Sequence, residues 1–146
     1  MPRRLISEII QGQELVVALP TITVRDVAVK MAAAQVGAVL VVEEERLVGI
    51  FTERDALNKV LAVGRDPAST LVGEVMAHQP QTILPEKPLA YALHMMVEGG
   101  FRHVPVVDAG GSLRGMVSAR DALGQDILDL ERDLRRLSEL ENSIGY

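Results

Sequence analysis

Two short stretches of the chain carry a glycine, a hydroxyl and a carboxylate at the same spacing. The first reads "GIFTERD", from Gly49 to Asp55, and the second reads "GMVSARD", from Gly115 to Asp121. A Thr or Ser hydroxyl can donate a hydrogen bond to a phosphate oxygen, and a carboxylate can accept hydrogen bonds from two neighbouring hydroxyls, such as those of a ribose. The pattern is therefore suited to binding a nucleotide.

The same residues also have a purely structural interpretation. Thr52 with Asp55, and Ser118 with Asp121, have the spacing of a capping box, in which the hydroxyl accepts from a first-turn N–H and the carboxylate reaches back to the cap residue. The motif glycines are typical of strand positions where another backbone comes close. A strand that runs into a helix also presents free N–H groups, which favour an anionic ligand. The spacing alone leaves both interpretations open.

The sequence around the two motifs is repeated as well. A run rich in β-formers precedes each motif, at 38–42 and at 103–107, and a turn and a second short run follow it, which is typical of a β-hairpin. Pro88 suits the first turn of a helix and Gly99-Gly100 its end. Apolar residues at helical spacing lie farther upstream in both copies: Val24, Val27, Ala28 and Met31 in the first, and Leu89, Ala92, Leu93 and Met96 in the second.

The pattern of each half therefore predicts a strand, a helix, two strands and a second helix, in that order. In the first half the second helix is expected from about Glu53 to Val63, and the stretch 65–70 is expected to connect the halves. A unit this small buries its apolar faces poorly on its own, so the copies are expected to pack together. We expect an α/β (α+β) fold of two tandem β-α-β-β-α repeats packed as a pseudo-two-fold pair, with repeats at 1–65 and 66–125 and a C-terminal helical extension at 126–146.

Composition narrows the possible function classes. Of the 146 residues 48% are hydrophobic, which suffices for a folded core. The net charge is −5 and Lys and Arg form no cluster, so nucleic acid is not expected as a partner. Cysteine is absent and the three histidines are too scattered for a metal site. No stretch resembles a membrane span or a signal peptide, so no membrane partner and a cytoplasmic location are expected.

Together these features resemble a tandem CBS-domain pair, that is, two cystathionine-β-synthase-type domains forming a Bateman module. The resemblance rests on the pattern Gly-apolar-x-Thr/Ser-x-x-Asp after an apolar strand such as "VPVV", found twice in register, and it extends from about Leu5 to Leu123. It implies adenosyl-ligand sites in the cleft between the repeats, with AMP or ATP favoured and S-adenosylmethionine or NAD(H) as alternatives. It implies no required cofactor, no metal and no catalytic residue.

The resemblance also implies which residues bind the ligand. The motif aspartates would hold the ribose hydroxyls and the motif Thr and Ser would lie near phosphate. Residues directly before the second apolar strand, and the arginines before the motif aspartates, could reach the phosphate, while residues near the edge strands would cradle the base. The expected ligand-binding set is Asp121, Ser118, Arg102, His103, Arg120, Val17, Thr21, Asp55, Thr52, Thr82 and Ile83.

The two repeats differ in charge near the motif. The second carries Arg102 and His103 where the first carries Gly37 and Ala38. Because a phosphate needs positive charge, the Asp121 site is expected to be the stronger nucleotide site. The first site is then expected to be weaker, to take a less charged ligand or to be empty.

The C-terminal segment carries a heptad-like stripe, made of Leu123, Ile127, Leu130, Leu134 and Leu137. The stripe could pack on its own module or form a contact between two copies. CBS pairs commonly associate as two-fold dimers, so the resemblance favours a homodimer.

We therefore expect a stand-alone regulatory CBS pair that binds an adenine nucleotide without changing it chemically, as an energy or metabolite sensor. The protein that it would regulate is another chain of unknown identity. The alternative is a ligand-free structural or interaction module in which the motifs only cap helices. An enzyme is not expected, because no nucleophile is placed beside a base.

Overall fold

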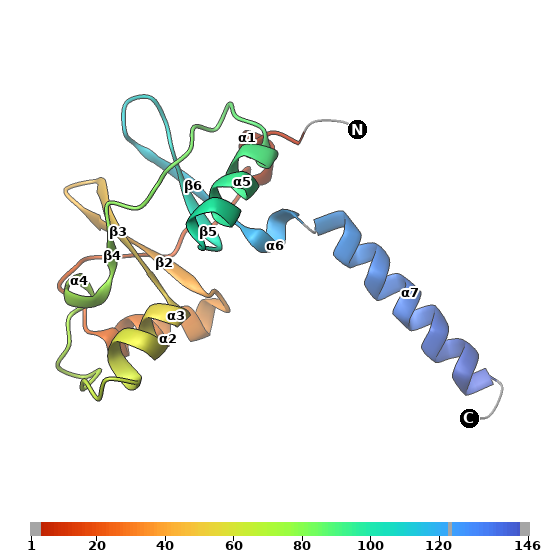
Figure 1. The fold of residues 1–146 in the computed structure, drawn as a ribbon, viewed down its shortest axis with the longest axis horizontal. Helices are drawn as coiled ribbons and strands as arrows, with labels where there is room; N and C mark the ends of the chain where they lie inside the picture. The colour runs from red at the N-terminus through yellow and green to blue at the C-terminus, as the bar shows by residue number, and fades with distance from the viewer. Residues whose placement is uncertain (1–3, 123, 144–146) are drawn as a thin grey trace.

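A computed structural model describes residues 4–122 and 124–143 (Figure 1). The elements in the first half of the chain are α1 (Ile6–Ile9), β1 (Val17–Ala18), α2 (Val24–Ala34), β2 (Ala38–Glu43), β3 (Arg46–Thr52), α3 (Glu53–Asp55) and the π-helix η1 (Ala56–Leu61). The elements in the second half are α4 (Val72–Val75), β4 (Ala77–His78), α5 (Leu89–Gly99), β5 (His103–Val107), β6 (Leu113–Ser118), α6 (Ala119–Ala122) and α7 (Gly124–Ser143). The expected mixed fold of two similar repeats followed by a C-terminal helix is confirmed.

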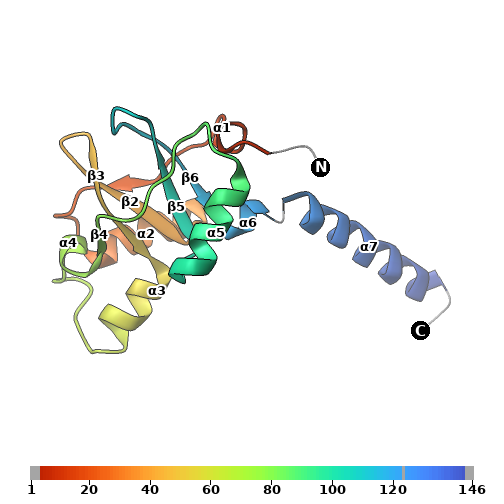
Figure 2. The same ribbon diagram turned by 45° about the horizontal axis from the view of Figure 1, so that its top comes forward.

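The strands form two small sheets. In the first sheet β1 runs parallel to β2, and β2, β3 and β4 pair antiparallel in that order. In the second sheet β5 and β6 form the predicted hairpin, and Ile83 pairs in parallel with Val106 of β5, as β1 does with β2. The sheets lie beside one another (Figure 2) and meet through an apolar cluster that includes Leu40, Ile50 and Met116.

Helices α2 and α5 bury most of the residues that the sequence predicts on their inner faces, but Ala28 of α2 is exposed and Leu93 of α5 is half-buried. Val24, Val27 and Met31 are buried in α2, and their counterparts Leu89, Ala92 and Met96 are buried in α5. The Thr23 hydroxyl caps α2 by accepting from Asp26 N at 3.2 Å. Pro88 stands at the N-cap of α5, and Gly100 ends it with a φ of 73°.

The helix after the first motif is wider than expected. It begins at Glu53 as predicted, but from Ala56 to Leu61 it is a π-helix, whose hydrogen bonds span five residues. One such bond joins Ala62 N to Leu57 O at 2.9 Å. The motif aspartate therefore stands at a junction between two helical forms.

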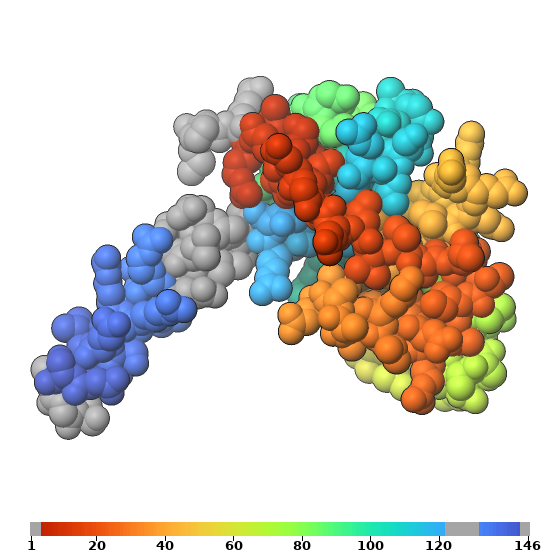
Figure 3. Space-filling model, turned by 180° about the vertical axis from the view of Figure 1, so that it is seen from behind, coloured from red at the N-terminus to blue at the C-terminus, as the bar shows by residue number. Residues whose placement is uncertain are grey.

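The two hydrophobic cores do not follow the order of the sequence. Helix α4 belongs to the second repeat by sequence, yet Val72, Val75 and Met76 pack in the core of the first. Helix α1 begins the chain, yet Ile6 is fully buried in the core of the second repeat, among Leu89 and its neighbours. Figure 3 shows the N-terminal residues (red) against the light blue residues of the second repeat. Each repeat therefore completes the core of the other.

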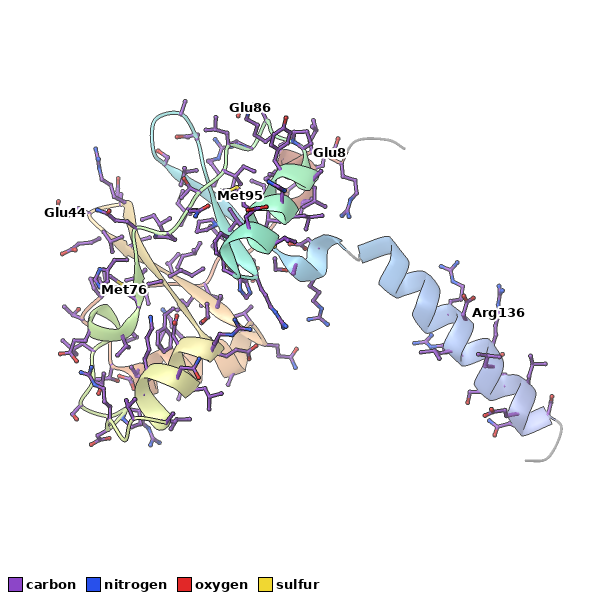
Figure 4. All side chains as sticks on the ribbon, viewed as in Figure 1. Glu8, Glu44, Met76, Glu86, Met95 and Arg136 are labelled. Atoms are coloured by element: carbon purple, nitrogen blue, oxygen red, sulfur yellow. The ribbon has the colours of Figure 1, made fainter. Side chains whose placement is uncertain are left out.

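The motif glycines permit this exchange. A β-carbon on Gly49 would lie 2.9 Å from Ala77 O and would collide with the side chain of Met76, which Figure 4 labels beside β3. A β-carbon on Gly115 would lie 2.7 Å from Ile10 Cβ. Contacts this short do not occur, so only glycine allows the leading segment of one repeat to cross the motif strand of the other.

The two repeats differ in how the leading segment of one contacts the motif strand of the other. In the first repeat the backbone of β4 pairs with β3 at Gly49 and Ile50. In the second repeat the Gln13 side chain replaces that backbone: its Nε2 donates to Met116 O and its Oε1 accepts from Met116 N, both at 2.9 Å. Leu15 then packs with Met116 and Val17 at the contact between the sheets.

Helix α7 extends away from both repeats (Figures 1 and 2). Leu134, Leu137 and Leu140 are 56%, 57% and 60% exposed. Leu123 of the predicted stripe lies outside the described residues, as do the side chains of Ile127 and Leu130. In the part of the stripe that the structure describes, the leucines do not pack on their own module.

We expect Gly49→Ala to destabilise the protein by about 1–3 kcal/mol, because the new methyl group would overpack the crossing of β3 and β4. Urea unfolding followed by circular dichroism measures this loss. The control is Gly110→Ala in the β5–β6 turn, where a β-carbon meets only Asp108 Oδ1 at 3.4 Å. Equal stability of the two variants would contradict the role given to Gly49.

Candidate functional site

A cavity of about 670 Å³ opens between the two repeats. Its walls come from the end of β3 with the helix that follows, from the segment that contains β4, and from the turn before β5. The lining residues are Gly37, Ile50, Thr52, Glu53, Arg54, Asp55, Leu57, Ala77, Pro80, Gln81, Gly100, Phe101, Arg102 and His103. A cavity of this size and mixed polarity is typical of small-molecule sites.

Thr52 and Asp55 form the capping box that the spacing predicts. Asp55 N donates to Thr52 Oγ1 at 3.2 Å, and Thr52 N donates to Asp55 Oδ2 at 3.0 Å. The Thr52 hydroxyl also donates to Asp55 Oδ2, at 3.1 Å. The box fixes the carboxylate at the start of the helix and in the cavity wall.

The second oxygen of Asp55 faces Lys59. Lys59 Nζ lies 3.1 Å from Asp55 Oδ1 and donates to Val75 O, also at 3.1 Å. A carboxylate has about four lone-pair sites for hydrogen bonds, so the box and Lys59 leave Asp55 with capacity for a further donor. The capping interpretation and the ligand-binding interpretation are therefore compatible at this residue.

The basic residues of the second repeat enter the same cavity as Asp55. Arg102 and His103 line the cavity, and Arg54 joins them from the first repeat. The sequence led us to associate Arg102 and His103 with the Asp121 site, because they precede the strand of the same repeat. The cavity instead combines a carboxylate from one repeat with basic groups from the other.

The second motif lies next to this cavity but does not line it. Ser118 N donates to Asp121 Oδ2 at 2.7 Å, so the carboxylate half of the box recurs there. Ser118 lies opposite His103 in the β5–β6 pair. Arg120 is exposed on α6. A role of these residues in ligand binding stays a prediction.

The four residues expected to cradle the base lie elsewhere. Val17 packs in the cluster between the sheets and Ile83 is buried in the second core. Thr21 is an exposed turn residue. Thr82 lines a second hollow of about 280 Å³, which is formed near the two hairpin turns. None of the four lines the larger cavity, so their contact with a ligand also stays a prediction.

The apolar wall of the cavity was missed by the sequence analysis. It includes Ile50 and Leu57 of the first repeat, and Ala77 and Pro80 of the segment that contains β4. A signal was present for the first pair, because Ile50 lies within the motif and Leu57 lies two residues after it. The segment that contains β4 gave no such signal in the sequence, since its position depends on packing between the repeats.

His103 is the one group in the described part of the chain whose pKa departs clearly from its ordinary value. Burial lowers the pKa of the imidazole, and the nearby Arg102 guanidinium lowers it further, while the carboxylates of Glu53 and Asp121 raise it; burial is the largest of these effects. His103 is therefore predominantly neutral at neutral pH.

Two kinds of feature, a metal-binding cluster and a membrane-spanning helix, are absent from the described residues. These residues contain no group of three or more His, Asp or Glu side chains that could hold a metal ion. Among them, no helix combines the length and apolar character needed to cross a bilayer.

Comparison with known proteins gives consistent results. The family model described as "CBS domain" matches residues 6–62 and again 72–126. The protein CBSCBSPB1 of Arabidopsis thaliana, described as CBS domain-containing, is 42% identical over 98 residues; the match covers 67% of this chain but only 18% of that protein's length.

Two solved structures show the same fold at higher coverage. The crystal structure of the CBS domain NE2398 has a TM-score of 0.80 and 30% identity, covering 86% of this chain and 99% of that one. The CBS domain protein PAE2072 from Pyrobaculum aerophilum, solved in complex with AMP, has a TM-score of 0.74 and 30% identity, covering 80% of this chain and 88% of that one.

The lowered pKa of His103 predicts how stability depends on pH. Because folding disfavours the protonated imidazole, the contribution of His103 is fully present above its unfolded pKa and is lost as the pH falls through the lower folded value. We expect the free energy of unfolding to fall between about pH 7.5 and pH 5.5 by more in the wild type than in His103→Gln. Urea unfolding at the two pH values measures the difference, and parallel losses would contradict the prediction.

Proposed function

The chain belongs to the CBS-domain family, and on that premise we propose that it binds an adenosyl ligand in the cavity at Asp55 and acts as a regulatory module that leaves the ligand chemically unchanged. The observation that carries the proposal is the cavity itself. It joins the motif residues Thr52 and Asp55 to basic residues of the other repeat. The AMP complex of the Pyrobaculum aerophilum protein supports an adenosyl ligand.

The lining of the cavity suits the three parts of such a ligand. The Asp55 carboxylate is an acceptor for ribose hydroxyls. Arg54 and Arg102 provide positive charge for a 5′ phosphate. Ile50, Ala77 and Pro80 offer apolar surface for a purine base. AMP is our first candidate among adenine nucleotides, and S-adenosylmethionine and NAD(H) are the alternatives.

The shared walls provide a route to regulation. Because the lining comes from both repeats, the binding free energy depends on how the repeats are placed relative to one another. A ligand with different affinities for two placements shifts the population between them. The shift would alter the surface offered to a regulated protein.

Asp121, together with Ser118 and Arg120, remains a candidate for a second ligand-binding site.

The competing proposal, a ligand-free interaction module, is favoured by the complete capping box at Thr52 and Asp55. The two proposals differ in whether any adenosyl ligand stabilises the protein.

We expect AMP at 100 times its Kd to stabilise the wild type by about 2.7 kcal/mol and to raise its Tm by roughly 5–10 °C. Asp55→Ala should abolish this shift, because the ribose acceptor is lost. Asp121→Ala is the matched control, since it also removes a capping carboxylate, and it should keep the shift. Thermal unfolding with AMP, ADP, ATP, S-adenosylmethionine and NAD(H) makes the measurement.

Each other result has a distinct meaning. If no ligand of the panel raises the Tm of the wild type, the ligand-free module is correct. If Asp121→Ala abolishes the shift and Asp55→Ala keeps it, the ligand binds at the second motif instead. Steady turnover of a ligand would show an enzyme.

We also propose that two copies associate through α7. Leu134 and Leu137 are more than half exposed, which leaves apolar surface for a second copy to cover. We expect Leu134→Gln with Leu137→Gln to shift the sedimentation coefficient from dimer to monomer. The control is Arg135→Gln with Glu139→Gln, two residues on either side of Leu137 and thus on the opposite helix face. A double leucine variant that stays dimeric would contradict the proposal.

A further inference from the structure

Glu53 and Ala119 occupy equivalent places in the two repeats. Glu53 N donates to Gly37 O at 3.0 Å, and Ala119 N donates to Arg102 O at 2.8 Å. The hydrogen bond is conserved between the repeats while both side chains differ. At this point the first repeat contributes an acid and no base, whereas the second contributes a base and no acid.

The Glu53 carboxylate lies against residue 37. Its Oε1 is 3.1 Å from the position that a β-carbon on Gly37 would take. The absence of a side chain at Gly37 gives the carboxylate this space. Glu53 and Arg102 line the same cavity, so the two repeats bring opposite charges to one binding space.

The charges of the lining residues nearly cancel. The lining residues Arg54 and Arg102 face the carboxylates of Glu53 and Asp55, and Lys59 lies 3.1 Å from Asp55. His103, flanked by Glu53, Asp121 and Arg102, adds no charge at neutral pH because burial lowers its pKa. Three cationic groups, Arg54, Arg102 and Lys59, thus face two carboxylates, which leaves at most one net positive charge to offset a triphosphate.

We propose that Glu53 determines the specificity of this cavity for adenosyl ligands that carry one phosphate or none at the 5′ position, over those that carry a polyphosphate. The inference rests on the proposed function and selects among its candidate ligands. A carboxylate about 6 Å from a phosphate charge, at an effective dielectric constant of about 20–40, weakens binding roughly ten- to a hundredfold. Each added phosphate brings further charge into this field.

The test compares adenosine, AMP and ATP by calorimetric titration at neutral pH without divalent cations. The variant is Glu53→Gln, which keeps the shape of the side chain and removes its charge. The control is Glu86→Gln, the same change in net charge at the loop before α5, on the far side of that helix from α3 (Figure 4).

In the wild type we expect ATP to bind no more tightly than AMP. Glu53→Gln should lower the Kd of ATP about tenfold, lower that of AMP less, and leave that of adenosine unchanged. Glu86→Gln should leave all three unchanged. The unchanged adenosine affinity also shows that the variant is folded; if Glu53→Gln fails to fold, Glu53→Ala, which gives the first repeat the residue of the second, replaces it.

The inference and the proposed function fail in different ways. If the wild type binds none of the three ligands, the proposed function is wrong and the inference falls with it. If the wild type binds adenosine or AMP but Glu53→Gln leaves the ratio of the AMP and ATP affinities unchanged, the inference alone is wrong. The same holds if the variant weakens all three ligands equally, because Glu53 then has a structural role.

Discussion

The contact of Ala77 O with Gly49, 2.9 Å from where a β-carbon would lie, determines how the two repeats meet. It lets β4 pair with β3, and that pairing brings the following residues, including Pro80, to the wall of the cavity. The same close approach at Gly115 admits Ile10 and Gln13 to the second repeat. The motif glycines thus act on the site indirectly, because they position the segment that closes it.

The hydroxyl and carboxylate of the motif serve the fold and the site together. At Thr52 and Asp55 the cap uses one carboxylate oxygen, and the other faces Lys59, four residues farther along the chain. A local hydrogen-bond pattern that must be kept for the helix therefore also holds an acceptor in a fixed place. The two copies differ in their surroundings, since only the first lines the larger cavity.

The sequence predicted what depends on local pattern. The buried faces of α2 and α5 are confirmed except at Ala28, which is exposed, and the proline and glycine at the ends of α5 and the two hairpins are confirmed as well. It did not predict that Ile6 would pack in the core of the second repeat and Val72 in the core of the first, or that Arg102 would line the same cavity as Asp55. Those features arise from packing between repeats, and side-chain periodicity within a repeat carries no information about it. The π-helix was also missed, because its sequence has ordinary helical character.

The exchange of leading segments also bears on the order in which the protein can acquire its structure during synthesis. The ribosome completes the first repeat by sequence before Val72, Val75 and Met76 have been made, so its core lacks part of its packing at that stage. Ile6 is made well before Val104 and Val117, with which it shares a core. Neither repeat can therefore complete its core while the other is still missing, and native packing has to arise cooperatively once both repeats have been made.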